Sequence, residues 1–247
     1  MKHSIPTLIL ILLTSFCLSS QCLIGIDSNN FDFYSYDFST ESYTDLRLNA
    51  GPFTFDTYLS ITEGITDDEV YVGYLKDSGF GSFDPIIIRY NLTNNSSIEV
   101  ISEDIEEPID IAIDVSTRKI YWIDKELDHL ASADLDGANS EVLGSVTDFL
   151  TGWNPVLAID EINQVIYFSQ GGRSVFRTSI DNWNPIEIPT TFSEPASRVG
   201  DIVIDETSQF LYWSNNTPDS NPHIVKVNLS TMEETKLVEV PLSLIHI

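Results

Sequence analysis

Short runs of alternating or β-branched apolar residues recur along the chain, and Asp, Asn, Gly and Pro separate them. No long segment spaces its apolar residues at the 3.6-residue period of a helix, whereas the period of two found here is typical of strands. In the clearest stretch we expect four strands, at residues 109–114, 119–125, 130–135 and 140–143. The pattern therefore predicts an all-β chain.

Two motifs repeat at a period of about 45 residues. In the first, an aliphatic residue and an Asp are followed, seven residues after the Asp, by Tyr and a second aromatic residue; its copies begin at Asp114, Asp160 and Asp205. The second is a polar–aliphatic–polar turn, found at residues 37–39, 91–93, 134–136, 179–181 and 228–230. Four strands in each unit of about 45 residues are typical of a β-propeller blade.

The recurring residues are interpreted as structural. An active site needs a given catalytic residue once, whereas a residue that recurs in every unit is expected to have a structural role in every blade. This interpretation covers the three Asp residues and the aromatic pairs Tyr121-Trp122, Tyr167-Phe168 and Tyr212-Trp213, which we expect in the core between sheets.

Residues 108–114, 118–124 and 133–137 together closely resemble the Tyr-Trp-Thr-Asp repeat, or class B repeat, of low-density-lipoprotein receptors. The resemblance implies a six-bladed propeller in which the fourth residue of the motif ties neighbouring strands together. Asp124 has that place here, whereas the next two units carry Gln170 and Asn215. The chain has room for about four to five blades.

The repeats and the chain ends define the expected organisation. We predict a signal peptide at 1–20, outer strands of a closing blade with a linker at 21–52, and blades within 53–241, at about 53–102, 104–148, 150–192 and 197–240. Residues 242–247 resemble the translation of a common sequencing adapter, so we expect native sequence to stop near Pro241. A genuine final strand is the alternative.

The first residues carry an export signal. A short basic start, an apolar run at 5–18 and a small polar cluster at 19–21 match the three regions of a secretory signal. An uncleaved anchor and a lipoprotein attached at Cys22 are the alternatives. We therefore expect a secreted or extracellular protein, or the ectodomain of a membrane receptor if the chain continues.

Charge narrows the range of partners. The chain has 12 Lys and Arg against 38 Asp and Glu, a net charge of -26, which argues against nucleic acid and against direct membrane binding. An extracellular protein with a basic patch is the expected partner. Two cysteines, Cys17 and Cys22, exclude a disulfide scaffold. A receptor-type propeller that binds protein, and is not an enzyme, is the leading interpretation.

The candidate sites outside the repeat are few. Trp153 and Trp183 are flanked by Asn and Pro, so we expect them in loops, as anchors of a binding surface. Asp110 and Asp201 lie four residues before the repeated Asp of their units, at the expected mouth of the central channel. A weak calcium site there is less favoured than a solvated pair. Such a site underlies the alternative function, a metal-dependent lactonase or esterase.

Secretion would also expose glycosylation sequons in a eukaryotic cell. The Asn-x-Ser/Thr pattern occurs at Asn91, Asn94, Asn95, Asn215 and Asn228.

Overall fold

The structure is a computed structural model. It describes residues 22–26, 33–37, 42–45, 57–66, 68–79, 81–94, 96–146, 155–169, 174–190, 198–216 and 223–239. Every element in these ranges is a β-strand, and none of their residues forms a helix long and apolar enough to cross a membrane.

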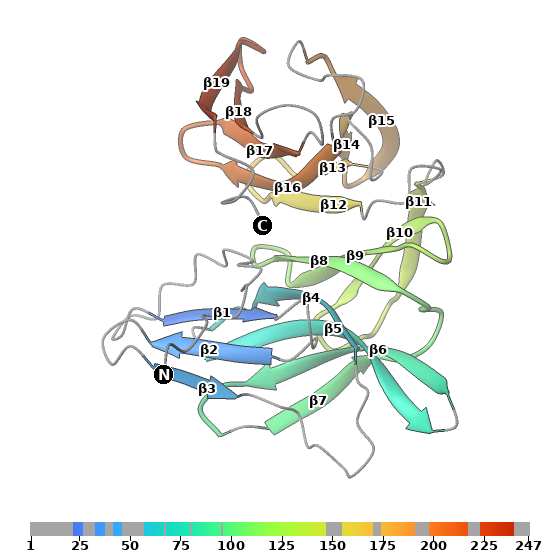
Figure 1. Ribbon diagram of the computed structural model, residues 1–247. Coiled ribbons are helices and arrows are strands. Elements are labelled where there is room, and N and C mark those ends of the chain that lie inside the picture. Colours follow the sequence, from blue (N-terminus) through green and yellow to red (C-terminus); the bar gives the residue numbers. More distant parts are fainter. Residues whose placement is uncertain are drawn as a thin grey trace. The chain divides into compact units, whose positions relative to one another are not determined.

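A three-stranded antiparallel sheet comes first in the chain (Figure 1). It consists of β1 (Cys22–Ile26), β2 (Phe33–Asp37) and β3 (Ser42–Asp45), in that order across the sheet. The segment at 21–52, predicted to hold outer strands and a linker, thus contains three strands.

Four further sheets each contain four strands that follow one another in chain order. Antiparallel neighbours of this kind need only short hairpins between them. The prediction of an all-β chain of four-stranded blades is confirmed. The strands are β4 (Thr57–Glu63), β5 (Glu69–Gly79), β6 (Ser82–Asn91) and β7 (Ser96–Ile101); β8 (Pro108–Asp114), β9 (Lys119–Asp124), β10 (His129–Asp134) and β11 (Glu141–Ser145); β12 (Val156–Asp160), β13 (Val165–Ser169), β14 (Val175–Ser179) and β15 (Asn182–Ile188); and β16 (Arg198–Asp205), β17 (Phe210–Asn216), β18 (His223–Asn228) and β19 (Glu234–Glu239).

The chain divides into two compact units, of which the first ends at Ile113 and the second begins at Asp114. In the first unit, Val72 and Ile88 belong to a buried cluster on β4–β6. In the second, Leu211 and Trp213 of β17 pack in one cluster with residues of β12–β15. Each cluster lies on a sheet face, as the alternation of side chains along a strand requires.

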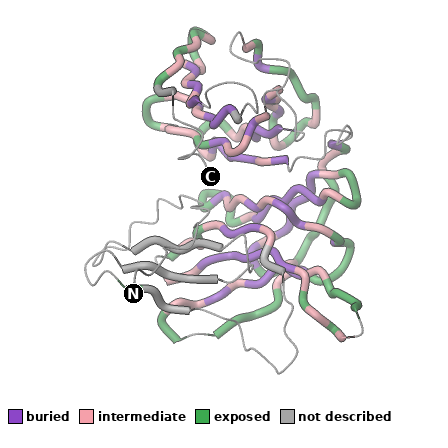
Figure 2. Tube along the Cα trace, viewed as in Figure 1, coloured by how far each residue is buried: buried purple, intermediate pink, exposed green. Residues whose placement is uncertain are grey.

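The second strand of a blade is its most buried part (Figure 2). β9 and β13 are buried from their second residue to their last, and β5 is buried from Val70 to Tyr74. A strand with no exposed side chain has both of its faces covered.

A close approach in the first unit depends on a glycine. The Ser60 hydroxyl donates a hydrogen bond to the carbonyl oxygen of Pro108, at 2.9 Å. A Cβ on Gly73 would lie 2.6 Å from Ser60 Oγ and 2.8 Å from the Pro108 oxygen. Only glycine fits between β4 and the start of β8.

Candidate functional site

The repeated Asp organises the hairpin between the first and second strands of its sheet. Its Oδ1 accepts a hydrogen bond from the backbone amide three residues later, which is a turn that Asp favours. The pairs are Asp114 with Thr117 (3.0 Å), Asp160 with Asn163 (2.9 Å) and Asp205 with Ser208 (2.9 Å). The next residue has a left-handed backbone in each copy: Arg118 (φ 57°), Gln164 (φ 54°) and Gln209 (φ 55°).

These hairpins also join one sheet to the next. Gln164 reaches back across the junction and donates from Nε2 to Asp114 Oδ2, at 3.0 Å, while it also donates to the Glu161 carbonyl at 2.8 Å. Glu161 Oε2 in turn accepts from the backbone amide of Ser116 at 3.0 Å. The sheets β8–β11 and β12–β15 are thus tied by two side chains of the later sheet.

The same arrangement returns one repeat later. Glu206 Oε1 accepts from the backbone amide of Glu161, and Gln209 Oε1 accepts from Asn163 Nδ2 at 3.0 Å. Burial raises the pKa of Glu206 although the Glu161 amide favours its ionised form. This network of ties was not predicted from the sequence, although Glu161 and Glu206 recur at the repeat period next to the repeated Asp.

Hydrogen bonds keep the Asp114 carboxylate ionised by lowering its pKa. Burial of the carboxylate would raise its pKa, but donors from Ser116, Gln164 and Thr117 outweigh burial and hold the pKa below its usual value. The ionised carboxylate is therefore the form that the hairpin and its neighbour bind.

The motif aromatics lie on opposite faces of the second strand. Burial raises the pKa of Tyr121 and of Tyr167 to about 12. On the other face the exposed fractions are 0% for Trp122, 0% for Phe168 and 2% for Trp213. Tyr212 differs from the other two tyrosines because it is only half-buried.

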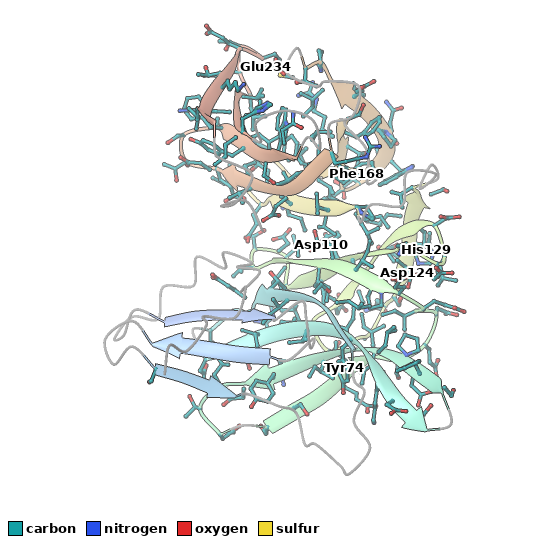
Figure 3. The ribbon with its side chains drawn as sticks, viewed as in Figure 1. Tyr74, Asp110, Asp124, His129, Phe168 and Glu234 are labelled. Atoms are coloured by element: carbon teal, nitrogen blue, oxygen red, sulfur yellow. The ribbon has the colours of Figure 1, made fainter. Side chains whose placement is uncertain are left out.

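The fourth position of the motif closes the next hairpin. Asp124 is fully buried, and its Oδ1 accepts from the Leu127 backbone amide at 3.0 Å. Its cross-strand neighbour on β10 is His129; both are labelled in Figure 3. In β17, Asn215 has the place of Asp124 and contacts His223 on β18, with 3.3 Å between Nδ2 and Nε2.

Asp110 and Asp201 are both half-buried, one in each compact unit. Each accepts a hydrogen bond at Oδ1 from the next backbone amide, Ile111 at 3.0 Å and Ile202 at 2.8 Å. Burial raises the pKa of Asp201 to about 6. The described ranges contain no group of three or more His, Cys, Asp or Glu suited to a metal.

Asp201 belongs to a polar end of the last sheet. The pairing of β16 with β17 shifts between Val199 and Ile202, so Asp201 lies in a bulge opposite Ser214. The Ser214 hydroxyl is buried and has no hydrogen-bond partner within the described part of the chain. Asn215 of β17 and His223 of β18 lie at the same end and are buried, so the half-buried Asp201 is the candidate contact residue there.

Trp183 lies in strand β15 and not in the predicted loop. Its half-buried ring stacks on Phe168 of the same sheet, with centroids 5.5 Å apart and planes inclined by 22°. It also covers Gly144 of β11, where an added Cβ would lie 2.2 Å from the ring. Pro185 suggested a loop, but β15 is an outer strand, where proline is tolerated. Trp153 lies outside the described residues.

The sequons differ in accessibility. Asn94 is exposed. Asn91 and Asn228 are half-buried, and their Oδ1 atoms accept backbone amides in turns. Asn215 is only 3% exposed, and Asn95 is outside the described residues. Asn94 is the best placed of the four described sequons to accept a glycan.

Comparison with known proteins gives a fold and no sequence family. No protein-family model and no curated protein matches the sequence. A nidogen structure, solved as a nidogen–laminin complex, matches with a TM-score of 0.60 at 17% identity, over 87% of this chain and 91% of the other. TolB from Acinetobacter baumannii matches with 0.61 at 12% identity, over 85% and 49%. An oligogalacturonate lyase in complex with manganese matches with 0.57 at 15% identity, over 89% and 62%. These likenesses show that the fold is similar to that of six-bladed propellers.

Proposed function

We propose that this protein is an extracellular, non-enzymatic β-propeller that binds another protein. The observation that carries the proposal is the likeness to the nidogen propeller, which covers most of both chains and whose structure was solved in complex with laminin. Fold likeness alone does not fix a function. The Tyr-Trp-x-Asp motif ending at Asp124 and the polar end of the last sheet support the same proposal from the residues of this chain.

Charge supports a partner with a basic surface. The net charge of -26 attracts cationic patches and accelerates encounter with them, and salt screens this attraction over about 10 Å. Asp201 is our candidate for direct contact, because it lies half-buried beside an unpaired hydroxyl.

Binding of the purified chain to immobilised laminin and to a panel of basic extracellular proteins tests the proposal. We expect saturable binding to at least one of them that weakens as salt is raised. Asp201→Asn should weaken it by about tenfold, as loss of a charged contact does, whereas Glu126→Gln removes the same charge at an exposed turn and should not. No saturable binding across the panel would contradict the proposal.

Export is part of the proposed function. We propose that residues 1–20 are removed during secretion, so the mature chain begins near Gln21. Expression in secreting cells, with N-terminal sequencing of the protein in the medium, tests this. A product that keeps Met1 or stays in the cells would contradict it.

A further inference from the structure

Glu161 makes hydrogen bonds through three of its groups and thereby links three consecutive hairpins. Its backbone amide donates to Glu206 Oε1, in the hairpin after β16. Its Oε2 accepts from the Ser116 amide, in the hairpin after β8, at 3.0 Å. Its carbonyl accepts from Gln164 Nε2 at 2.8 Å, and Gln164 also donates to Asp114 at 3.0 Å. The contacts of Glu161 therefore run from one neighbouring hairpin to the other.

The hairpin that contains Glu161 is itself held by further hydrogen bonds. Asp160 Oδ1 and Oδ2 accept from the amide and from Nδ2 of Asn163, at 2.9 and 2.8 Å. Asn163 Nδ2 also donates to Gln209 Oε1 at 3.0 Å, and Gln209 Nε2 donates to the Glu206 carbonyl at 2.7 Å. The hairpins after β12 and β16 are thus joined at two points, through Glu206 and through Gln209.

This network is contained in one part of the molecule. All of its residues belong to the second compact unit, and the three hairpins contact each other directly. The hydrogen bonds named here therefore need no residue of the first unit.

We propose that Glu161 couples the two junctions, so that loss of the Glu206 contact also weakens the hydrogen bond between Glu161 and Ser116. Glu206 fixes the Glu161 amide, and that amide fixes the backbone from which the Glu161 side chain reaches Ser116. A hydrogen bond weakens steeply when its angle is lost, and residues that share one network commonly couple energetically. The coupling is a property separate from binding to laminin or another basic partner.

Hydrogen exchange of the Ser116 amide in the complete chain, measured by NMR, tests the proposal. Glu206→Ala removes the acceptor of the Glu161 amide but changes neither Ser116 nor the Glu161 side chain. We expect the Ser116 amide to exchange about tenfold faster, as loss of a hydrogen bond to a charged group allows. The Leu127 amide, which Asp124 binds in the hairpin after β9, should keep its exchange rate.

Two matched variants separate the hydrogen bond from the loss of charge. Glu206→Gln removes the same charge but keeps an oxygen that accepts hydrogen bonds, so the Ser116 amide should keep its exchange rate. Glu233→Ala removes an exposed acid from the turn between β18 and β19, and it should also leave that rate unchanged.

The coupling must act in both directions, because linkage between two equilibria is reciprocal. Glu161→Ala removes the contact with Ser116 but leaves Glu206 in place. The backbone amide at position 161, corrected for the intrinsic rate of the new sequence, should then also exchange about tenfold faster. A hydrogen bond that acts only locally predicts no change there.

An unchanged Ser116 amide in Glu206→Ala would overturn the proposal, as would equal acceleration of Ser116 and Leu127 or an unchanged amide at position 161 in Glu161→Ala. Far-UV circular dichroism checks the fold of each variant. If Glu206→Ala misfolds, Glu206→Asp withdraws the acceptor by one methylene, and the same selective acceleration at Ser116 is expected.

Discussion

Replacing Gly144 with Ala probes how Trp183 packs between neighbouring sheets. The added methyl carbon would lie 2.2–2.3 Å from three atoms of the indole ring, whereas carbon atoms in contact are ordinarily about 3.5–4.0 Å apart. The ring must therefore move by about 1.5 Å. It cannot move toward Phe168, because that ring is fully buried and already stacked against it.

The ring can escape only by swinging outward. That motion gives up the stacking with Phe168, which contributes about 0.5–1.5 kcal/mol, and exposes apolar surface worth about 25 cal/mol per Å². Overpacking substitutions generally cost about 1–3 kcal/mol. We expect Gly144→Ala to reduce the free energy of unfolding by about 2 kcal/mol, which lowers the melting temperature by about 4–8 °C for a chain of this size.

A double-mutant cycle measured by urea unfolding tests this reasoning. Trp183→Ala alone should cost about 2 kcal/mol, since it removes a half-buried indole. In the Trp183→Ala background, Gly144→Ala should be nearly neutral, because the atoms it collides with are gone. If Gly144→Ala costs as much without the indole as with it, the packing argument is wrong.

Three further predictions concern ionisation, modification and the hairpins. Asp201 has a folded-state pKa raised to about 6, so the stability it contributes is complete below about pH 4 and is lost as pH rises through about 6. Asp201→Asn should remove that loss and stabilise the chain at neutral pH by at most about 3 kcal/mol in urea unfolding; an unchanged pH profile would contradict this. In secreting eukaryotic cells, Asn94→Gln should reduce a glycan-dependent gel shift and Asn215→Gln should not, because Asn94 is exposed and Asn215 is buried. Gln164→Ala should lower the free energy of unfolding by about 1 kcal/mol, because it removes the hydrogen bond to Asp114. It should also raise the Asp114 pKa, so that less stability is lost as pH falls. If the stability of the variant falls with acid pH as steeply as that of the wild type, the Gln164–Asp114 hydrogen bond is refuted.

The strands and the repeat could be predicted because they depend on local patterns. The alternation of apolar and polar residues identifies a strand from the local sequence alone, and a repeat period near 45 residues identifies the blade. The sequence also predicted a structural role for the repeated Asp in every blade, although not the hydrogen bond that it accepts within its hairpin. Asp114, Asp160 and Asp205 therefore have the same geometry in all three copies.

Contacts between sheets could not be predicted in the same way. Trp183 looks like a loop residue beside its Asn and Pro neighbours, and only the position of β15 as an outer strand makes that composition compatible with a strand. Glu161 and Gln164 look like ordinary polar turn residues. Their partners, Ser116 and Asp114, lie 45 and 50 residues earlier, and one sequence does not reveal such pairs.

The hairpin ties join neighbouring sheets independently of the fourth motif residue, because the hydrogen bond described for Asp124 lies within its own hairpin. Gln170 and Asn215 replace the acid that Asp124 retains, yet Glu161 and Glu206 each bind a backbone amide of the preceding sheet. The first copy has Val115 at the corresponding place, and a valine side chain cannot accept a hydrogen bond.

The junction before that copy must therefore be held differently. There the Ser60 hydroxyl binds the Pro108 carbonyl across Gly73. We conclude that at least one hydrogen bond joins the sheets at each of the three described junctions between four-stranded sheets, and that different residues make it.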